Sequence, residues 1–196
     1  MPRTSTFTPA LVGTGLIARL RRAADGNVAV EFALALPVLL LMMLGSAELA
    51  RFVILHQKVD RVAVTMSDLV SRAETVSESD LDDIFVAAGQ VAQPFDIGNL
   101  GVVIVSSVTN PDGAGPVVAW QRSGGGALSA TSQLGIEGEA ASLSADFEVR
   151  QGETAIIAEV FYDFEPFLSE VVVAPQTIYR RAHHRPRLGT LEAVEP

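Results

Sequence analysis

The sequence has 196 residues and no cysteine, and this absence excludes several kinds of chemistry. Without a thiol the chain can form no disulfide, thiolate nucleophile, iron–sulfur cluster or cysteine-ligated zinc site. Histidine is also scarce, with His56 in the first half of the chain and the adjacent pair His183 and His184 near its end. None has a second histidine four residues away, as a zinc-binding helix requires, so we expect no metal and no cofactor.

Other catalytic and ligand-binding motifs are missing as well. The chain has no Gly-x-Ser-x-Gly nucleophile elbow, and its Gly-rich stretch at 123–126 is not followed by the Gly-Lys-Ser/Thr of a phosphate loop. Asp96, Asp112 and Asp163 lack the spacing of a calcium loop. We therefore expect a protein that is not an enzyme, with an exported or anchored hydrolase as an alternative.

Basic residues are few in the body of the chain and gather at its ends. Residues 1–26 contain four arginines and one aspartate, whereas residues 60–178 contain four arginines and 18 acidic residues. This acidic body, in a chain of net charge -9, would repel nucleic acid, so we expect no nucleic-acid partner. A hydrophobic content of 48% excludes a disordered chain and suffices for one modest domain.

The apolar residues are concentrated in one uncharged run at 32–47, which extends back across Glu31 to Val28. As a helix, residues 28–47 would cover about 30 Å, the thickness of the hydrocarbon core of a bilayer. We therefore predict a single transmembrane helix in contact with membrane lipid. Because arginines precede this run and nothing equally basic follows it, the N-terminus should lie in the cytoplasm and the acidic body outside.

Two other interpretations of the apolar run remain open. One is a buried core helix, although such a helix rarely needs apolar residues on every face. The other is a cleavable secretory signal with its cut after the small residues 45–47. Glu31 interrupts the apolar core of such a signal, and the helical pattern continues through the proposed cut.

That helical pattern extends well beyond the apolar run. Apolar residues recur at alternating spacings of three and four, at Phe52, Leu55, Val59, Val62, Met66, Leu69 and Ala73. The spacing predicts one helix from about residue 27 to residue 73, with its first half in lipid and its second half packed on protein. Pro37 removes an amide donor in the first half and predicts a kink and contact with neighbouring helices there.

The rest of the sequence predicts a small exported α+β domain at residues 76–182, followed by a basic, flexible tail at 183–196. The stretch Ser77-Glu78-Ser79-Asp80 offers an N-cap for a short amphipathic helix at about 80–90. A β-hairpin is predicted at 101–121, around the turn signal Asn-Pro-Asp-Gly.

The second half of this domain carries weaker strand signals. Residues 123–143 predict a long, loosely ordered loop, and residues 154–164 predict a strand. Residues 171–173 and 177–180 predict short edge strands. We expect a small antiparallel sheet of one layer, whose apolar face is covered by the second half of the long helix.

The residues around Glu31 form an ordered motif. Arg21 and Arg22 precede Gly26, and Glu31 stands at the fifth position after this glycine, followed by Phe32. This arrangement resembles the prepilin-peptidase site of type IV pilins and pseudopilins. The resemblance implies cleavage between Gly26 and Asn27 by a prepilin peptidase, and pairing of Glu31 with the new N-terminal amine of a neighbouring subunit. The predicted cleavage-site residues are Gly26, Asn27, Glu31 and Phe32.

The segment that follows resembles the TadE/TadG-like family of tight-adherence pilus assembly proteins. The family string occurs in order, as VEFA at 30–33, LP at 36–37 and a Leu-rich run at 38–44, then Gly45, Glu48, Leu49 and Arg51. The resemblance implies a pilin-like fold, a place in the bacterial inner membrane, and a structural role as a minor pilin or pseudopilin. Its partners would be other pilin subunits and the pilus assembly machinery.

We expect subunits to pack through the long helix, at Glu31, Pro37, Glu48, Arg51, Phe52, Leu55, Val59 and Val62. Glu48 and Arg51 are three residues apart, so they can pair at the outer membrane boundary, either as a simple interfacial ion pair or as a subunit contact. The alternative function is a membrane-tethered periplasmic binding or adhesive domain unrelated to pili. That alternative predicts that Glu31→Ala leaves function unchanged.

Overall fold

The structure is a computed structural model that describes residues 25–145, 147–167 and 172–195. The chain divides into two compact units, residues 1–46 and 47–196, which are described separately. Of the predicted cytoplasmic leader at residues 1–26, residues 1–24 lie outside the described part. The elements of the described part are α2 (Asp25–Ser71), α3 (Glu78–Ala92), α4 (Ile97–Leu100), β1 (Gly101–Thr109), β2 (Val117–Gly124), β3 (Thr154–Phe164) and β4 (Gln176–His184).

The described part of the first unit consists of the apolar half of α2. This helix continues through Pro37, and its most apolar 18-residue stretch has a mean hydropathy of 2.3 with none of its residues buried. A core helix of a soluble protein would be mostly buried, so the structure does not support that interpretation. By length and composition α2 can cross a membrane, consistent with a single-pass anchor.

In the second unit, α2 buries one side of its remaining turns. Leu55, Val59, Val62 and Met66 are buried as the spacing predicts. The next buried position is Val70, whereas the predicted Leu69 is exposed and Ala73 follows the end of the helix at Ser71. The strict seven-residue pattern was therefore wrong in its last turns. A straight α-helix has 3.6 residues per turn, so its buried face drifts away from a 3.5-residue repeat.

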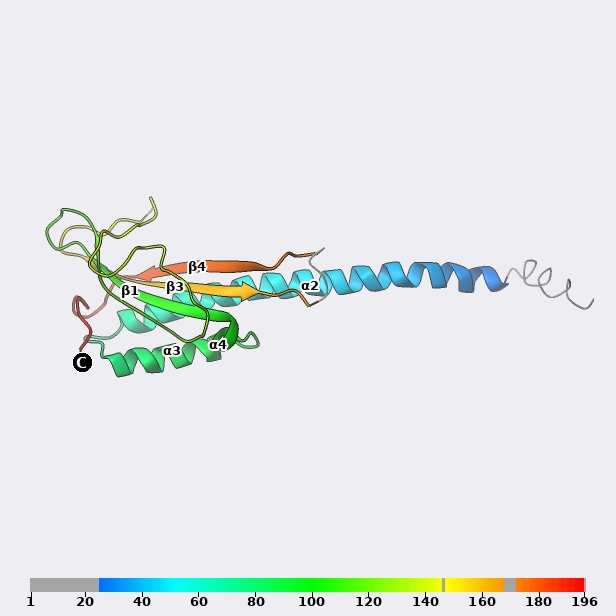
Figure 1. Ribbon diagram of the computed structural model, residues 1–196, viewed down its shortest axis with the longest axis horizontal. Helices are drawn as coiled ribbons and strands as arrows, with labels where there is room; N and C mark the ends of the chain where they lie inside the picture. Colours follow the sequence, from blue (N-terminus) through cyan, green and yellow to red (C-terminus); the bar gives the residue numbers. More distant parts are fainter. Residues whose placement is uncertain (1–24, 146, 168–171, 196) are drawn as a thin grey trace, which may run out of the picture. The chain divides into compact units, whose positions relative to one another are not determined.

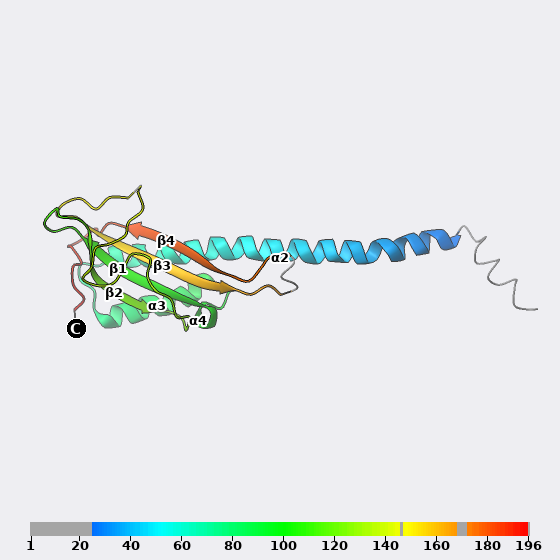
Figure 2. The same cartoon turned by 45° about the horizontal axis from the view of Figure 1, so that its top comes forward.

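The four strands form one antiparallel sheet in the order β2-β1-β3-β4 (Figure 2). The predicted hairpin is confirmed as β1 paired with β2, and the predicted strand at 154–164 is β3. The two predicted edge pieces are replaced by one nine-residue strand, β4, which begins at Gln176 and ends at His184. Ile178 and Ala182 of this strand contribute to the main core.

One face of the sheet is covered by helices (Figure 1). Side chains from α2 and α3 share one apolar cluster with alternate residues of the strands, such as Val105 on β1 and Ala158 on β3. The predicted N-cap is confirmed, because Ser77 and Asp80 form a capping box at the start of α3. The expected α+β fold, with the long helix packed on a small antiparallel sheet, is therefore confirmed.

The opposite face of the sheet is also covered, which the prediction of a one-layer sheet missed. Leu134 and Val149, from the long segment between β2 and β3, are buried against Val108, Val118 and residues of β3. Every residue of β1 is consequently buried. The segment is irregular in backbone but well packed, because its scattered apolar side chains fill this second cluster.

Glu159 of β3 lies on this second face with its side chain fully buried. It accepts hydrogen bonds from the Ser132 hydroxyl, the Gln133 amide (3.0 Å) and the Tyr179 hydroxyl (2.8 Å). Burial, followed by the hydrogen bond to Glu159, raises the pKa of Tyr179. We call the segment between β2 and β3 the covering segment. These hydrogen bonds attach it to β3 and β4, and they stabilise the Glu159 carboxylate, whose burial without partners would be unfavourable.

Residues 183–195 of the segment predicted as a flexible tail, 183–196, are instead packed within the second unit. His183 and His184 end β4, and the Arg187 amide donates to the Ser71 carbonyl at the end of α2. Leu191 is buried, and its carbonyl accepts from the indole of Trp120 at 2.8 Å. The Leu191 side chain fills the core and the Leu191 carbonyl satisfies the buried indole N–H, so both hold this segment against the sheet.

Candidate functional site

The predicted cleavage-site residues lie in the first turns of α2. Gly26 and Asn27 follow its first residue, Asp25, and Glu31 and Phe32 are exposed on the helix. The basic leader that would precede the cut lies mostly outside the described residues. Processing after Gly26 therefore stays a prediction.

Glu48 and Arg51, the other charged residues of the motif, are at the start of the second unit. They form the predicted ion pair, with Arg51 Nη1 at 3.3 Å from Glu48 Oε1. The Glu48 side chain is only 2% exposed, and its second oxygen accepts the Phe167 amide at 3.1 Å. The carboxylate therefore connects α2 to the segment that follows β3, in addition to pairing with Arg51.

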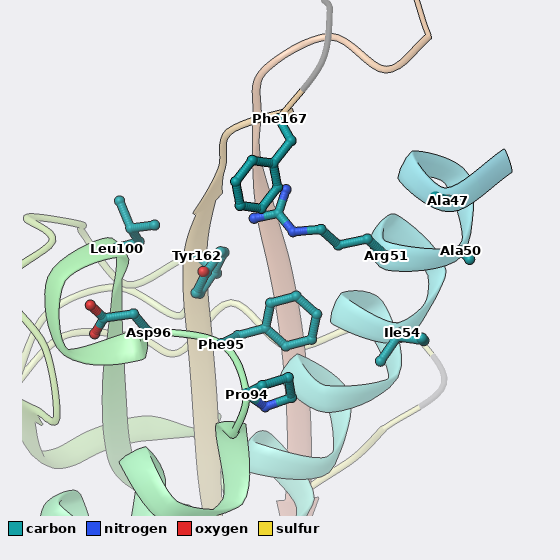
Figure 3. Close-up of a pocket in the computed structure, with 10 residues that line it drawn as sticks. All are labelled: Ala47, Ala50, Arg51, Ile54, Pro94, Phe95, Asp96, Leu100, Tyr162 and Phe167. Carbon is teal, nitrogen blue, oxygen red and sulfur yellow. The ribbon is translucent and has the colours of Figure 1, made fainter. Parts of the chain in front are cut away.

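Arg51 is held between aromatic rings in the same place. Its guanidinium carbon lies 4.4 Å from the centre of the Phe167 ring (Figure 3). The same carbon lies 5.2 Å from the centre of the Phe164 ring. Nη1 also donates to the Glu165 carbonyl at 2.9 Å. Cation–π contacts together with the ion pair fix the side chain and neutralise its charge locally.

A groove of about 650 Å³ opens beside this cluster (Figure 3). One wall is α2, and the other walls come from the segment before β1 and from the end of β3. The lining is mostly apolar and consists of Ala47, Ala50, Arg51, Ile54, Pro94, Phe95, Asp96, Leu100, Tyr162 and Phe167. Sequence reasoning did not find this groove, because its walls are brought together only by the fold.

Of the other residues predicted for subunit packing, Pro37 is exposed in the first unit, whereas four residues of the second unit face its interior. Phe52 packs against Phe164 with ring centres 5.1 Å apart, and Leu55, Val59 and Val62 are buried in the main core. These three positions present little surface to another chain. The exposed apolar residues of α2 in this unit include Leu49, Val53 and Ile54.

A serine–histidine pair also occurs in the second unit. Ser67 Oγ lies 2.8 Å from His184 Nδ1, but the serine is fully buried and its hydroxyl donates to the Ala63 carbonyl at 2.9 Å. A hydroxyl that donates within its own helix and has no exposed surface is not placed as a nucleophile. No group of three or more metal-ligating side chains is found among the described residues.

Comparison with known proteins adds one match. Residues 26–65 match the family model described as TadE-like protein. Neither the curated proteins nor the solved structures give a match to this chain. The matched segment begins at Gly26, contains the whole apolar run, and ends within the buried half of α2. The resemblance of this chain to the TadE-like family is therefore confirmed, and it rests on residues 26–65.

Proposed function

We propose that this protein is a membrane-anchored minor pilin- or pseudopilin-like subunit that takes part in assembly of a bacterial tight-adherence pilus. It acts by packing against other subunits and has a structural role. The TadE-like match at residues 26–65 carries the proposal, because a TadE-like segment suggests a protein associated with this kind of pilus. The partners are pilin-like subunits, the assembly machinery and a prepilin peptidase.

In this proposal, residues 28–47 cross the inner membrane once, with the leader in the cytoplasm and the second unit outside. The length and hydropathy of the apolar half of α2 support this topology. The four arginines before the apolar run support the same orientation.

Subunits pack through the exposed apolar surface of α2. In the first unit this surface includes Phe32, Leu36 and Leu40, and Pro37 lies among them. Glu31 sets the register of the contact by pairing with the α-amino group of Asn27 in a neighbouring subunit, as the pilin resemblance implies. Helix packing in lipid supplies the remaining contact energy.

Mass spectrometry of the membrane-bound protein tests the processing step on which the Glu31 pairing depends. In cells that contain the cognate prepilin peptidase, we expect the intact mass to lack residues 1–26 and the first residue to be Asn27. Gly26→Val should block cleavage, because the added side chain stands directly at the scissile bond. Gly15→Val is the matched control in the same leader and should be cleaved normally. An intact N-terminus in the wild-type membrane fraction contradicts this part of the proposal.

A further inference from the structure

Phe167 has an exposed apolar side chain, although hydrogen bonding fixes its backbone amide. Its side chain is 80% exposed, yet its amide donates to buried Glu48 and its ring lies over Arg51 (Figure 3). Exposure of a large apolar ring is unfavourable in water. The hydrogen bond and the cation–π contact therefore hold an apolar group outward at a defined place.

The connectivity of the chain limits how far the Phe167 ring can lie from the membrane. Glu48 follows directly after the apolar run that ends at Ala47, and Phe167 is one hydrogen bond away from Glu48. One residue of helix advances the chain by about 1.5 Å. If residues 28–47 cross the bilayer, Phe167 must lie within a side chain's length of its surface.

The two charged side chains in contact with Phe167 are paired with each other. Glu48 and Arg51 form an ion pair, and Glu48 is buried. The groove beside them is mostly apolar, and Ile54 in its lining is exposed. Leu49 and Val53 of α2 are exposed as well. Exposed apolar side chains close in sequence to a membrane-spanning segment are suited to the boundary between lipid headgroups and acyl chains.

We propose that the Phe167 end of the second unit is a lipid contact surface, in which Phe167 inserts into the interfacial zone of the bilayer and lipid covers the groove. This inference rests on the proposed membrane anchoring. The contact fixes the second unit against the membrane before assembly. The exposed carboxylates of Asp96 and Glu165 lie nearby and would repel anionic headgroups. We therefore expect the contact to form with phosphatidylcholine, which has no net charge.

The absence of cysteine allows a direct test by single-site labelling. The full chain carrying Phe167→Cys is labelled with an environment-sensitive fluorophore and reconstituted in phosphatidylcholine vesicles. Some vesicles contain lipid with a nitroxide quencher just below the headgroup. Leu188→Cys is the matched control. It is an exposed apolar position next to Arg187, whose amide binds Ser71, about 30 Å along α2 from Arg51. Leu41→Cys reports on the apolar run itself.

We expect quenching at position 167 to approach that at position 41, with no quenching at position 188. Quenching at 41 without quenching at 167 overturns the lipid contact and leaves the membrane anchor intact. A label at 167 that is shielded only when other pilin subunits are added assigns the surface to protein and also overturns it. Absence of quenching at both 41 and 167 overturns the anchor and, with it, this inference. Trp120 emission, from a buried indole, checks that each variant is folded.

Discussion

Glu48 is the first acidic side chain after the apolar run, and its burial sets how the second unit begins. One of its carboxylate oxygens accepts a hydrogen bond from the Arg51 guanidinium, and the other accepts one from the Phe167 amide. A buried carboxylate without such partners costs several kcal/mol. The pair predicted from the spacing of Glu48 and Arg51 is present, whereas the Phe167 partner is 119 residues away and leaves no signal in local spacing.

His183 provides a test at the residue scale. Although His183 is largely exposed, partial desolvation lowers its pKa below the ordinary 6.5, and its positively charged neighbours His184, Arg181 and Arg185 act in the same direction. As pH falls through 6.5, the unfolded chain therefore takes up a proton before the folded chain does. The contribution of neutral His183 to stability is complete above pH 6.5 and is lost as pH falls toward and below the folded-state pKa.

We therefore expect His183→Gln to reduce the loss of thermal stability on acidification. The measurement is Tm of the full chain in detergent, followed by Trp120 fluorescence from neutral pH down to about pH 5. Wild type should lose more stability than the variant across this range. An equal loss in both proteins would show that His183 does not contribute.

At the scale of elements, α2 combines two surfaces on one continuous helix. In the second unit one side of α2 packs into the core. Two valine-to-alanine changes, one on the buried side of the helix and one on its exposed side, test which side that is. Val62 is 0% exposed, whereas Val64, two residues later, is 42% exposed. Val62→Ala should reduce the free energy of unfolding by about 2 kcal/mol, because it removes two buried methyl groups and leaves a cavity.

Val64→Ala is the matched control, and its effect should stay within about 0.5 kcal/mol. Denaturant unfolding of both full-length variants in detergent measures the difference. Equal destabilisation by the two changes would contradict the register assigned to α2.

The elements differ in how well local sequence predicts them. The hairpin is predictable because β1 is rich in β-branched residues and a strong turn signal separates it from β2. Strand β3 is predictable from the alternation in its sequence. The full length of β4 was missed because Arg180, Arg181, His183 and His184 interrupt its apolar pattern. An edge strand needs only one apolar side, which Ile178 and Ala182 supply here.

The covering segment between β2 and β3 could not be predicted for a different reason. Leu134 and Val149 each have one apolar residue two positions away, Ile136 and Phe147, and these pairs are too short to indicate a strand. Their burial depends on contacts with the sheet that form only in the folded chain. The same limit applies to the groove beside Arg51, whose walls come from three distant segments.

At the scale of the whole molecule, the C-terminal segment completes the folded unit. Leu191 is buried and Leu188 is exposed, so the two leucines offer a second matched comparison. Leu191→Ala should cost about 2–5 kcal/mol of unfolding free energy, because it removes a buried side chain and leaves a cavity. Without that anchor the backbone carbonyl of residue 191 should hold the Trp120 indole less firmly, so Trp120 emission should move to longer wavelength. Leu188→Ala should change neither quantity measurably. A flexible tail would make the two variants indistinguishable.

The two units together suit a subunit that is held in the membrane by one helix and presents a folded body outside it. The family match covers the apolar run and the first turns of the folded unit, whereas the remainder of that unit lies beyond the match. The proposed role therefore rests on the helix, because the match gives no information on the rest of the folded unit.

The most direct test of the pilus role is a count of surface pili by electron microscopy. The strains are the parent, a strain lacking this protein, and the deletion strain complemented with wild type or with Glu31→Ala, with equal protein levels in the membrane fraction. We predict few or no pili on the deletion strain, restoration by wild type, and failure of Glu31→Ala to restore them. Pili in parental numbers on the deletion strain would contradict the proposed role in assembly.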